Sequence, residues 1–244
     1  EDAKALLASR VDGLLVSITH QTEKYDHFED FIEAGIPVVF FDKAVESMKN
    51  TSRVIVDDRL GAFQAVEHLI GEWCRRIAHF TSPELSYTGK HRLQGYLDAH
   101  KRYGIPVDER LIRRCKVVEF EEGYRFALEM LSMEEPPDAI FAVTDEVALG
   151  AMTGLKGAGI TIPDQVAVMG FSNWKLASVV EPPLSTIAQP GFRIGQESIK
   201  LLLKEIQELK KDLPVTYQTM VLPTELIIRE SSRRQKTLVN VSNG

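Results

Sequence analysis

The sequence predicts an α/β protein built from two doubly wound, mainly parallel sheets. Apolar runs of strand length alternate with helical patterns along nearly the whole chain, as expected where helices cover a parallel sheet. We expect about nine strands, which is large for one sheet and natural for two. Of the 244 residues, 44% are hydrophobic and 26% are charged. This composition is typical of a globular protein with a sizeable core.

The expected elements follow one another in order. The predicted strands cover residues 11–18, 37–42, 53–58, 76–81, 115–120, 139–143, 166–171 and 221–229. The predicted helices cover residues 1–10, 22–35, 61–73, 90–104, 122–131, 145–157 and 193–210. In the last helix, the inward side chains are expected to be Ile199, Leu202, Ile206 and Leu209. The last strand should lie at a sheet edge, because Pro223 has no N–H to donate.

Composition and charge argue against several classes of protein. The net charge of −6 argues against nucleic-acid binding through the surface of this segment. We see no apolar run of membrane-spanning length and no signal peptide. Cys74 and Cys115 are too few for a disulfide framework and lack metal-ligand spacing. We expect free thiols, a cytoplasmic location, and neither a metal nor a cofactor.

Catalytic motifs are also missing from the sequence. There is no G-x-S-x-G, H-E-x-x-H or Walker A pattern, and the six histidines are scattered. Asp57 and Asp58 are adjacent, so on a strand their side chains would point to opposite faces. An enzyme is therefore not expected.

The stretch 139–190 reads as strand, helix, strand and crossover. Thr144 is expected to cap the helix, and Asp145 and Glu146 place negative charge on its first turn. Thr144 and the Ser172–Trp174 run both follow strand ends. Ligands of parallel sheets bind just beyond the carboxyl ends of the strands, so polar contacts are expected there.

Nine motifs stand in register along the chain. They are VDGLLV at 11–16, GIPVVFFD at 35–42, VDDRLGAFQAVEHL at 56–69, CRRIAHF at 74–80, HRLQGYLDA at 91–99, AVTDEVALGAM at 142–152, IPDQVAVMGFSN at 162–173, PPLSTIAQP at 182–190 and VLPTELIIRESS at 221–232. Together they resemble the effector-binding core of the LacI/GalR family of bacterial transcription regulators.

This resemblance implies two periplasmic-binding-protein-like subdomains joined by three crossovers, near Cys74, Gln189 and Val221. The amino-terminal subdomain would comprise residues 1–73 and 190–220. The carboxyl-terminal subdomain would comprise 74–189 and 221–232, followed by a polar tail at 233–244. By the same resemblance, the chain starts after the helix-turn-helix headpiece and the first strands of the core. The strand at 11–18 would then be left as an exposed apolar edge.

The resemblance also implies a function. The chain would be the effector-sensing and dimerising core of a DNA-binding transcriptional regulator, with a small sugar-like effector in the cleft between the subdomains. It would form a homodimer, would not contact membrane, and would reach operator DNA only through the headpiece. The alternative is a periplasmic sugar-binding protein of a transporter, which has the same fold. Residues upstream of Glu1 would separate the two, since a headpiece indicates a regulator and a signal peptide indicates transport.

Several residues are candidates for effector contact by this resemblance. Arg92 opens the R-L-x-G-Y pattern that carries the family's pocket arginine, and its guanidinium suits hydroxyls, carboxylates or phosphates. Phe120 matches an aromatic position, although core packing is an equally open interpretation. The further candidates, placed by the family pattern or by strand ends, are Thr88, Leu60, His20, Gln21, Asp42, Lys43 and Gln189. For His20, Gln21, Asp42 and Lys43, solvent exposure without contact is an open alternative.

Two positions depart from the family pattern. Thr144 stands where the family usually has Asn, and Ser172 where it usually has Asp. The effector is therefore not expected to be bound through the usual carboxylate, and the Asn173 amide could partly replace it. Trp174 is more often a packing residue than a ligand platform, and a structural role is favoured for Asp145.

Overall fold

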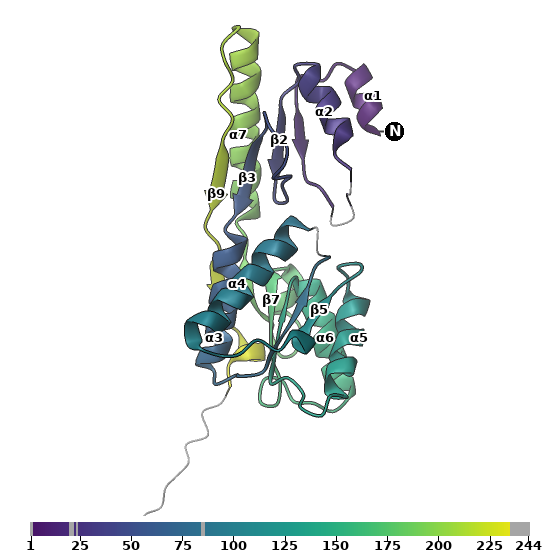
Figure 1. The fold of residues 1–244 in the computed structure, drawn as a ribbon, viewed down its shortest axis with the longest axis vertical. Coiled ribbons are helices and arrows are strands. Elements are labelled where there is room, and N and C mark those ends of the chain that lie inside the picture. Colours follow the sequence, from purple (N-terminus) through teal and green to yellow (C-terminus); the bar gives the residue numbers. More distant parts are fainter. Residues whose placement is uncertain (1, 20–21, 23, 84–85, 235–244) are drawn as a thin grey trace, which may run out of the picture. The chain divides into compact units, whose positions relative to one another are not determined.

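The computed structural model describes residues 2–19, 22, 24–83 and 86–234. The chain divides into two compact units. Unit 1 contains Glu1–Asp58, Pro83–His91 and Gln189–Thr224, and unit 2 contains Arg59–Ser82, Arg92–Ala188 and Glu225–Gly244. Each unit holds one sheet with its helices (Figure 1). The predicted fold class, α/β with parallel sheets, is confirmed.

Unit 1 has a four-stranded parallel sheet in the order β1-β2-β3-β9. The strands are β1 (Leu14–Val16), β2 (Val38–Phe41), β3 (Ser52–Val56) and β9 (Thr219–Leu222). Its helices are α1 (Asp2–Ala8), α2 (Asp26–Glu33) and α7 (Gly191–Lys210). Phe40 of β2 packs with α1 and α2, whereas its neighbour Val39 packs with α7. Helices therefore cover both faces of the sheet, because successive strand residues point to opposite faces.

Unit 2 has a six-stranded sheet in the order β10-β8-β7-β6-β4-β5. The strands are β4 (Ile77–Thr81), β5 (Ile112–Arg114), β6 (Ala139–Ala142), β7 (Ala167–Ser172), β8 (Ser185–Ala188) and β10 (Glu225–Ile227). Only β10 runs antiparallel to its neighbour among these strands. The carboxyl ends of the five parallel strands consequently meet at one edge of the sheet.

Two pairs of helices cover the two faces of this sheet. They are α3 (Asp58–Gly71) with α4 (Tyr87–Tyr103), and α5 (Phe120–Leu131) with α6 (Asp145–Gly157). The second pair packs at very short distance, because a Cβ at Gly150 would overlap the carbonyl oxygen of Phe120. Three short 3-10 helices complete the described chain: η1 (Glu109–Leu111), η2 (Lys175–Ser178) and η3 (Glu230–Ser232). Within the described residues, no helix combines the length and the apolar character needed to cross a membrane.

Helix α3 lies with unit 2. Its buried side chains Ala65 and Leu69 share one core with Ile77 and Tyr96. The sequence-based division assigned residues 61–73 to the first subdomain instead. The difference arises because the chain changes units at residue 58, before this helix, rather than near Cys74 after it.

Two predicted strands were wrong in extent. Residues 115–120 are not a strand, since β5 ends at Arg114 and Phe120 already opens α5. The single strand predicted at 221–229 is two strands, β9 in unit 1 and β10 in unit 2. Pro223 lies in the break, where the missing N–H removes a ladder hydrogen bond. Its edge position is confirmed, because β9 and β10 are the outer strands of their sheets among the described residues.

The inward face of α7 also differs from the prediction. Its buried residues are Ile194, Ser198, Leu201, Leu202 and Glu205. Ile199 and Leu209, predicted to point inward, are exposed. Leu202 and Ile206 do face the core, as predicted. Hydrophobicity alone missed the rest of the inner face, because it contains a serine and a glutamate.

Glu205 is the unexpected member of that inner stripe. Its side chain is 1% exposed, and burial raises its pKa. The Ser52 hydroxyl on β3 opposes this shift, but neither carboxylate oxygen reaches hydrogen-bond geometry with a described residue. An ionised Glu205 therefore destabilises the packing of α7 on the sheet.

We predict that Glu205→Gln raises the stability of the chain at neutral pH by about 1–3 kcal/mol, because glutamine keeps the size of the side chain but has no charge whose burial is unfavourable. Because the pKa of Glu205 is higher in the folded than in the unfolded chain, the wild-type chain keeps its full stability at pH values below the unfolded pKa. The wild-type chain loses stability as pH rises from the unfolded toward the folded pKa. The stability difference between Glu205→Gln and wild type should therefore increase over the same pH range. Urea unfolding at several pH values measures both. Glu208→Gln is the control, because Glu208 already pairs with Lys204 at 3.6 Å. A variant less stable than wild type at every pH would contradict the interpretation.

Candidate functional site

Polar side chains gather at the carboxyl ends of β6, β7 and β8 in unit 2. Thr144 follows β6 and is the N-cap of α6, as predicted. Its backbone is extended, and its Oγ1 accepts a hydrogen bond from the Val147 N–H at 3.3 Å. The cap satisfies one of the free N–H groups of the first turn. It also fixes the Thr144 hydroxyl at the sheet edge, half-buried.

The turn after β7 has an unusual backbone. Ser172 and Asn173 have φ values of 120° and 54°, in the region that side-chain-bearing residues seldom adopt. The turn is held from two sides. The Asn173 N–H donates to Thr186 Oγ1 at 3.2 Å, and the Trp174 N–H donates to Asp145 Oδ2 at 2.5 Å. These bonds offset the conformational cost of about 1–3 kcal/mol per strained residue.

Asp145 joins these elements from the first turn of α6. Its carboxylate is 1% exposed and also accepts from the Thr186 hydroxyl at 2.6 Å. Burial raises the pKa of Asp145, while the bonds from Thr186 and Trp174 and the charges of Arg229 and Arg92 oppose the rise. Gly170 leaves room for it, since a Cβ there would overlap Oδ1. This carboxylate thus has a structural role, as the sequence favoured.

Arg92 projects from α4 to the same edge. Its guanidinium carbon lies 3.5 Å from the centroid of the Phe171 ring, and its Nη1 donates to the Val143 carbonyl. The side chain is 3% exposed. Arg92 therefore places a buried positive charge where β6 and β7 end, next to Thr144 and Ser172.

Two further residues of this network, Arg229 and Thr186, were not predicted from the sequence. Arg229 follows β10 and donates through Nη2 to Asn173 Oδ1 at 2.8 Å, and through Nη1 to the Leu184 carbonyl at 2.6 Å. Thr186 lies in β8. Both fall in the motifs at 182–190 and 221–232, which was the available signal, but nothing in those motifs indicates the partner of either side chain.

Two further predicted contact residues, Phe120 and Leu60, also belong to unit 2. Phe120 opens α5 instead of ending a strand, and it lines a hollow of about 280 Å³ with Leu149, Met152, Thr153, Lys156, Val180 and Glu181. Leu60 lies in the first turn of α3, half exposed, and belongs to unit 2 rather than to the other subdomain. Trp174 is also half exposed and does not pack as the sequence suggested.

The remaining candidates belong to unit 1. Asp42 follows β2 with φ 61° and accepts from Gln189 Nε2 at 3.3 Å. Its carboxylate also lies 3.3 Å from Lys43 Nζ. Thr88 is buried in the first turn of α4, where its hydroxyl lies 3.2 Å from that of Ser86. His20 and Gln21 lie outside the described residues.

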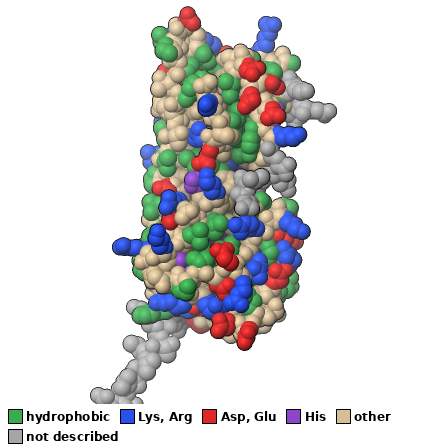
Figure 2. All heavy atoms as spheres, viewed as in Figure 1, with side chains coloured by type: hydrophobic (Ala, Val, Ile, Leu, Met, Phe, Trp, Pro, Cys, Tyr) green, Lys and Arg blue, Asp and Glu red, His purple; other side chains and the backbone are tan. Residues whose placement is uncertain are grey.

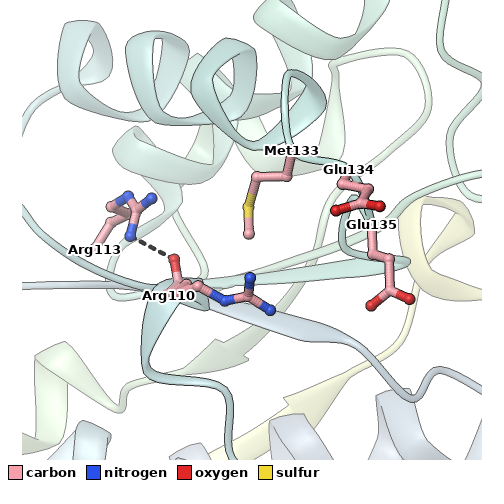
Figure 3. Close-up of a pocket in the computed structure, with 5 residues that line it drawn as sticks. All are labelled: Arg110, Arg113, Met133, Glu134 and Glu135. Atoms are coloured by element: carbon pink, nitrogen blue, oxygen red, sulfur yellow. Dashed lines mark hydrogen bonds between the residues drawn. The ribbon is translucent and has the colours of Figure 1, made fainter.

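A second hollow in unit 2 has a different position. It has a volume of about 560 Å³ and is lined by Arg110, Arg113, Met133, Glu134 and Glu135 (Figure 3). Arg113 donates to the Arg110 carbonyl there. Arg110 precedes β5, Arg113 lies within it, and the other three residues precede β6, so the hollow lies toward the amino ends of these strands. Ligands of parallel sheets bind at the opposite edge, and we do not assign this hollow to the effector. No group of three or more potential metal ligands occurs among the described residues.

Comparison with known proteins identifies the family. The model of the periplasmic binding protein-like domain matches residues 66–232. The chain is 34% identical over 208 residues to the HTH-type transcriptional repressor CytR of Escherichia coli K12, covering 79% of this chain and 60% of CytR. This chain thus spans about 60% of the length of that curated relative.

Two solved structures show the same similarity. The transcriptional regulator CelR–cellobiose complex superposes with a TM-score of 0.84 at 30% identity, covering 94% of this chain and 68% of CelR. The LacI family regulator from Enterococcus faecium with bound ribose gives 0.82 at 28% identity, covering 95% and 83%. These relatives are transcriptional regulators, so a transporter-associated binding protein is not favoured. The chain belongs to the LacI/GalR family of bacterial transcription regulators, of which it contains the periplasmic-binding-protein-like core.

Proposed function

We propose that this chain is the effector-sensing and dimerising core of a cytoplasmic LacI/GalR-type regulator that controls operator binding. The observation that carries the proposal is the polar cluster of Arg92, Thr144, Ser172 and Asn173. It lies at the carboxyl edge of the unit 2 sheet, where such folds bind ligands, and in a chain of this family. Asp42, Gln189, Thr88 and Leu60 are proposed as further contacts.

The proposed effector is a sugar or a sugar derivative, nucleosides included. Two relatives were solved with cellobiose and with ribose. Hydroxyl-rich ligands suit an edge that offers a guanidinium, two hydroxyls and an amide. We propose a binding role without catalysis, in keeping with relatives that are regulators.

DNA binding is not assigned to the surface of this core. The chain carries a net charge of −6, and Figure 2 shows acidic and basic side chains intermingled over unit 2 on the face drawn. Relatives of this family are named HTH-type regulators, so we propose that a helix-turn-helix part of the protein contacts the operator.

Self-association is proposed through an apolar face of unit 2, formed by α5, α6 and η2. Its exposed apolar residues are Tyr124, Leu128, Leu176 and Val179. The same elements carry the hollow lined by Phe120 of α5, Leu149 and Met152 of α6, and Val180, which follows η2. Exposed apolar patches of this kind commonly mark protein interfaces. We propose a second copy of the chain as the partner.

A thermal-shift screen tests the proposed function. Sugars, sugar acids, sugar phosphates and nucleosides are added to the chain, and the true effector should stabilise it by about 2.7 kcal/mol at a hundredfold excess over Kd. For a chain of this size, that corresponds to a rise in Tm of about 5–10 °C. If no compound of these classes raised Tm, a sugar-sensing role would be ruled out.

Arg92→Lys tests the assignment of Arg92. Lysine keeps the positive charge but loses the planar fork, so effector affinity measured by calorimetry should fall about tenfold or more, or ~1.4 kcal/mol. Arg125→Lys is a matched control, because Arg125 also lies over an aromatic ring, 4.4 Å from the centroid of Phe126, but on the exposed side of α5. Circular dichroism should show both variants folded. Unchanged affinity in Arg92→Lys would remove Arg92 from the site.

The dimer is tested by sedimentation velocity at tens of micromolar. We expect a mass about twice that of the 27.4 kDa chain. Val179→Glu should shift the population to monomer, because it places a charge on the apolar face at a residue that is 69% exposed. Trp73→Glu, at a residue 71% exposed that follows the end of α3, should not. A wild-type monomer, or a dimer insensitive to Val179→Glu, would contradict this interface.

A further inference from the structure

A further hollow of unit 2 lies beside the carboxyl-terminal half of α4. It has a volume of about 260 Å³, and its apolar and ring-bearing wall consists of Ile77, Tyr96, His100, Pro106, Val107 and Leu111. Ile77 opens β4 and Leu111 precedes β5. The hollow therefore lies toward the amino ends of these strands, at the sheet edge opposite to the one proposed for the effector.

The imidazole of His100 presents an open hydrogen-bond acceptor in this wall. His100 is 2% exposed, and its Nδ1 lies 2.9 Å from the Tyr96 carbonyl oxygen. A carbonyl oxygen only accepts, so Nδ1 carries the proton. Burial lowers the pKa of His100, so the ring is neutral at pH 7 and Nε2 has a lone pair. This nitrogen has no hydrogen-bond partner among the described residues, which is unusual for a buried polar side chain.

His79 has similar bonding but a different position. Its Nδ1 bonds to the Phe141 carbonyl at 2.9 Å, and its Nε2 has no partner among the described residues. His79 is 0% exposed and does not line the hollow. His100 does line it. The two nitrogens of an imidazole point in divergent directions, so Nε2 of His100 points away from the helix backbone that binds Nδ1. The His100 acceptor is therefore within reach of a molecule in the hollow.

Other polar groups of the wall are bonded within the chain. The Tyr96 hydroxyl donates to the Ile77 carbonyl at 2.9 Å, which leaves its ring as the surface offered to a ligand. The carboxylate of Asp108, which also lines the hollow, accepts from Arg110 through both oxygens, at 2.9 and 2.8 Å. These groups do not compete with His100 for a ligand donor.

The charges beside the hollow are balanced. Arg75 and Arg76 line it, but carboxylate oxygens of Asp108 and Glu135 lie 3.5 and 3.4 Å from the Arg76 guanidinium nitrogens. An anionic ligand is therefore not favoured. Guanidinium groups are instead attracted to the faces of aromatic rings.

We propose that this hollow is a second ligand site, for a neutral planar molecule of one or two aromatic rings whose N–H or O–H group donates to His100 Nε2. Its volume sets the size, because a cavity of about 150 Å³ holds benzene and drug-sized ligands need about 300 Å³ or more. The apolar wall and the Tyr96 ring suit an aromatic body. The site is separate from the one proposed for the effector, and it binds a different chemical class.

Ligand pairs of equal size test the need for a donor. Indole is compared with benzofuran, and phenol with fluorobenzene, because the second member of each pair keeps the ring but has no N–H or O–H group. Calorimetry on the chain should show the donor-bearing member of at least one pair binding about tenfold or more tighter, since its partner leaves Nε2 unsatisfied. Equal binding within both pairs, or no binding of any of the four, overturns the inference.

His100→Phe tests the acceptor itself. Phenylalanine keeps a flat ring but has no Nε2, so affinity for indole should fall about tenfold or more. Affinity for benzofuran should change less. His91→Phe is the matched control, because His91 lies on the same helix but pairs with Glu46 at 3.2 Å and does not line the hollow. Equal losses for indole and benzofuran would indicate a purely structural role for His100 and overturn the inference.

Val107→Trp gives an independent measurement if His100→Phe does not fold. Val107 is half-buried in the loop between α4 and η1, and the larger side chain should fill the hollow. Binding of indole and of benzofuran should then both be lost, while circular dichroism shows the chain folded. A folded Val107→Trp chain that binds indole as wild type does would place the ligand elsewhere and contradict the proposal.

Discussion

The buried carboxylate of Asp145 organises the carboxyl edge of the unit 2 sheet. It lies in the first turn of α6, where the helix dipole favours negative charge. It binds the Trp174 N–H and the Thr186 hydroxyl, and so ties the helix to the turn after β7 and to β8. Without it, two buried donors would lack their acceptor, and the strained backbone at Ser172 would lose its support. The positions of Ser172 and Asn173, two of the proposed ligand contacts, depend on that carboxylate.

The fold could be predicted largely from local patterns, because strand and helix periods are properties of short segments. The same patterns failed where tertiary contacts decide. On α7 two stripes had helical spacing, and only packing on the sheet selects the one with Ser198 and Glu205. Pro223 correctly marked an edge, but its sequence position could not show that the strands on its two sides join different sheets. The assignment of α3 to unit 2 likewise follows from tertiary contacts, because the helix shares a core with β4 and α4.

The candidate site was partly predictable for a similar reason. The N-cap at Thr144 is a local signal, and the strand-end rule located Ser172 and Asn173. The Arg229–Asn173 bond joins residues 56 positions apart, and no local pattern specifies such a pair. Burial of Arg92 on the Phe171 ring is also a long-range property. The sequence therefore indicated which strand ends are candidates for ligand contact. Only the structure shows in which direction each hydrogen-bond donor points.

This distinction bears on how one core can serve different effectors. The residues that hold the edge together, Asp145, Thr186 and Arg229, bond mainly to backbone and to one another. The residues proposed to meet a ligand, Ser172 and Asn173, lie in the turn that this frame holds. A substitution at Ser172 should therefore change the surface offered to a ligand and leave the frame intact. Ligand class can change in this way at small structural cost, because the strained turn is stabilised by groups other than the proposed ligand contacts.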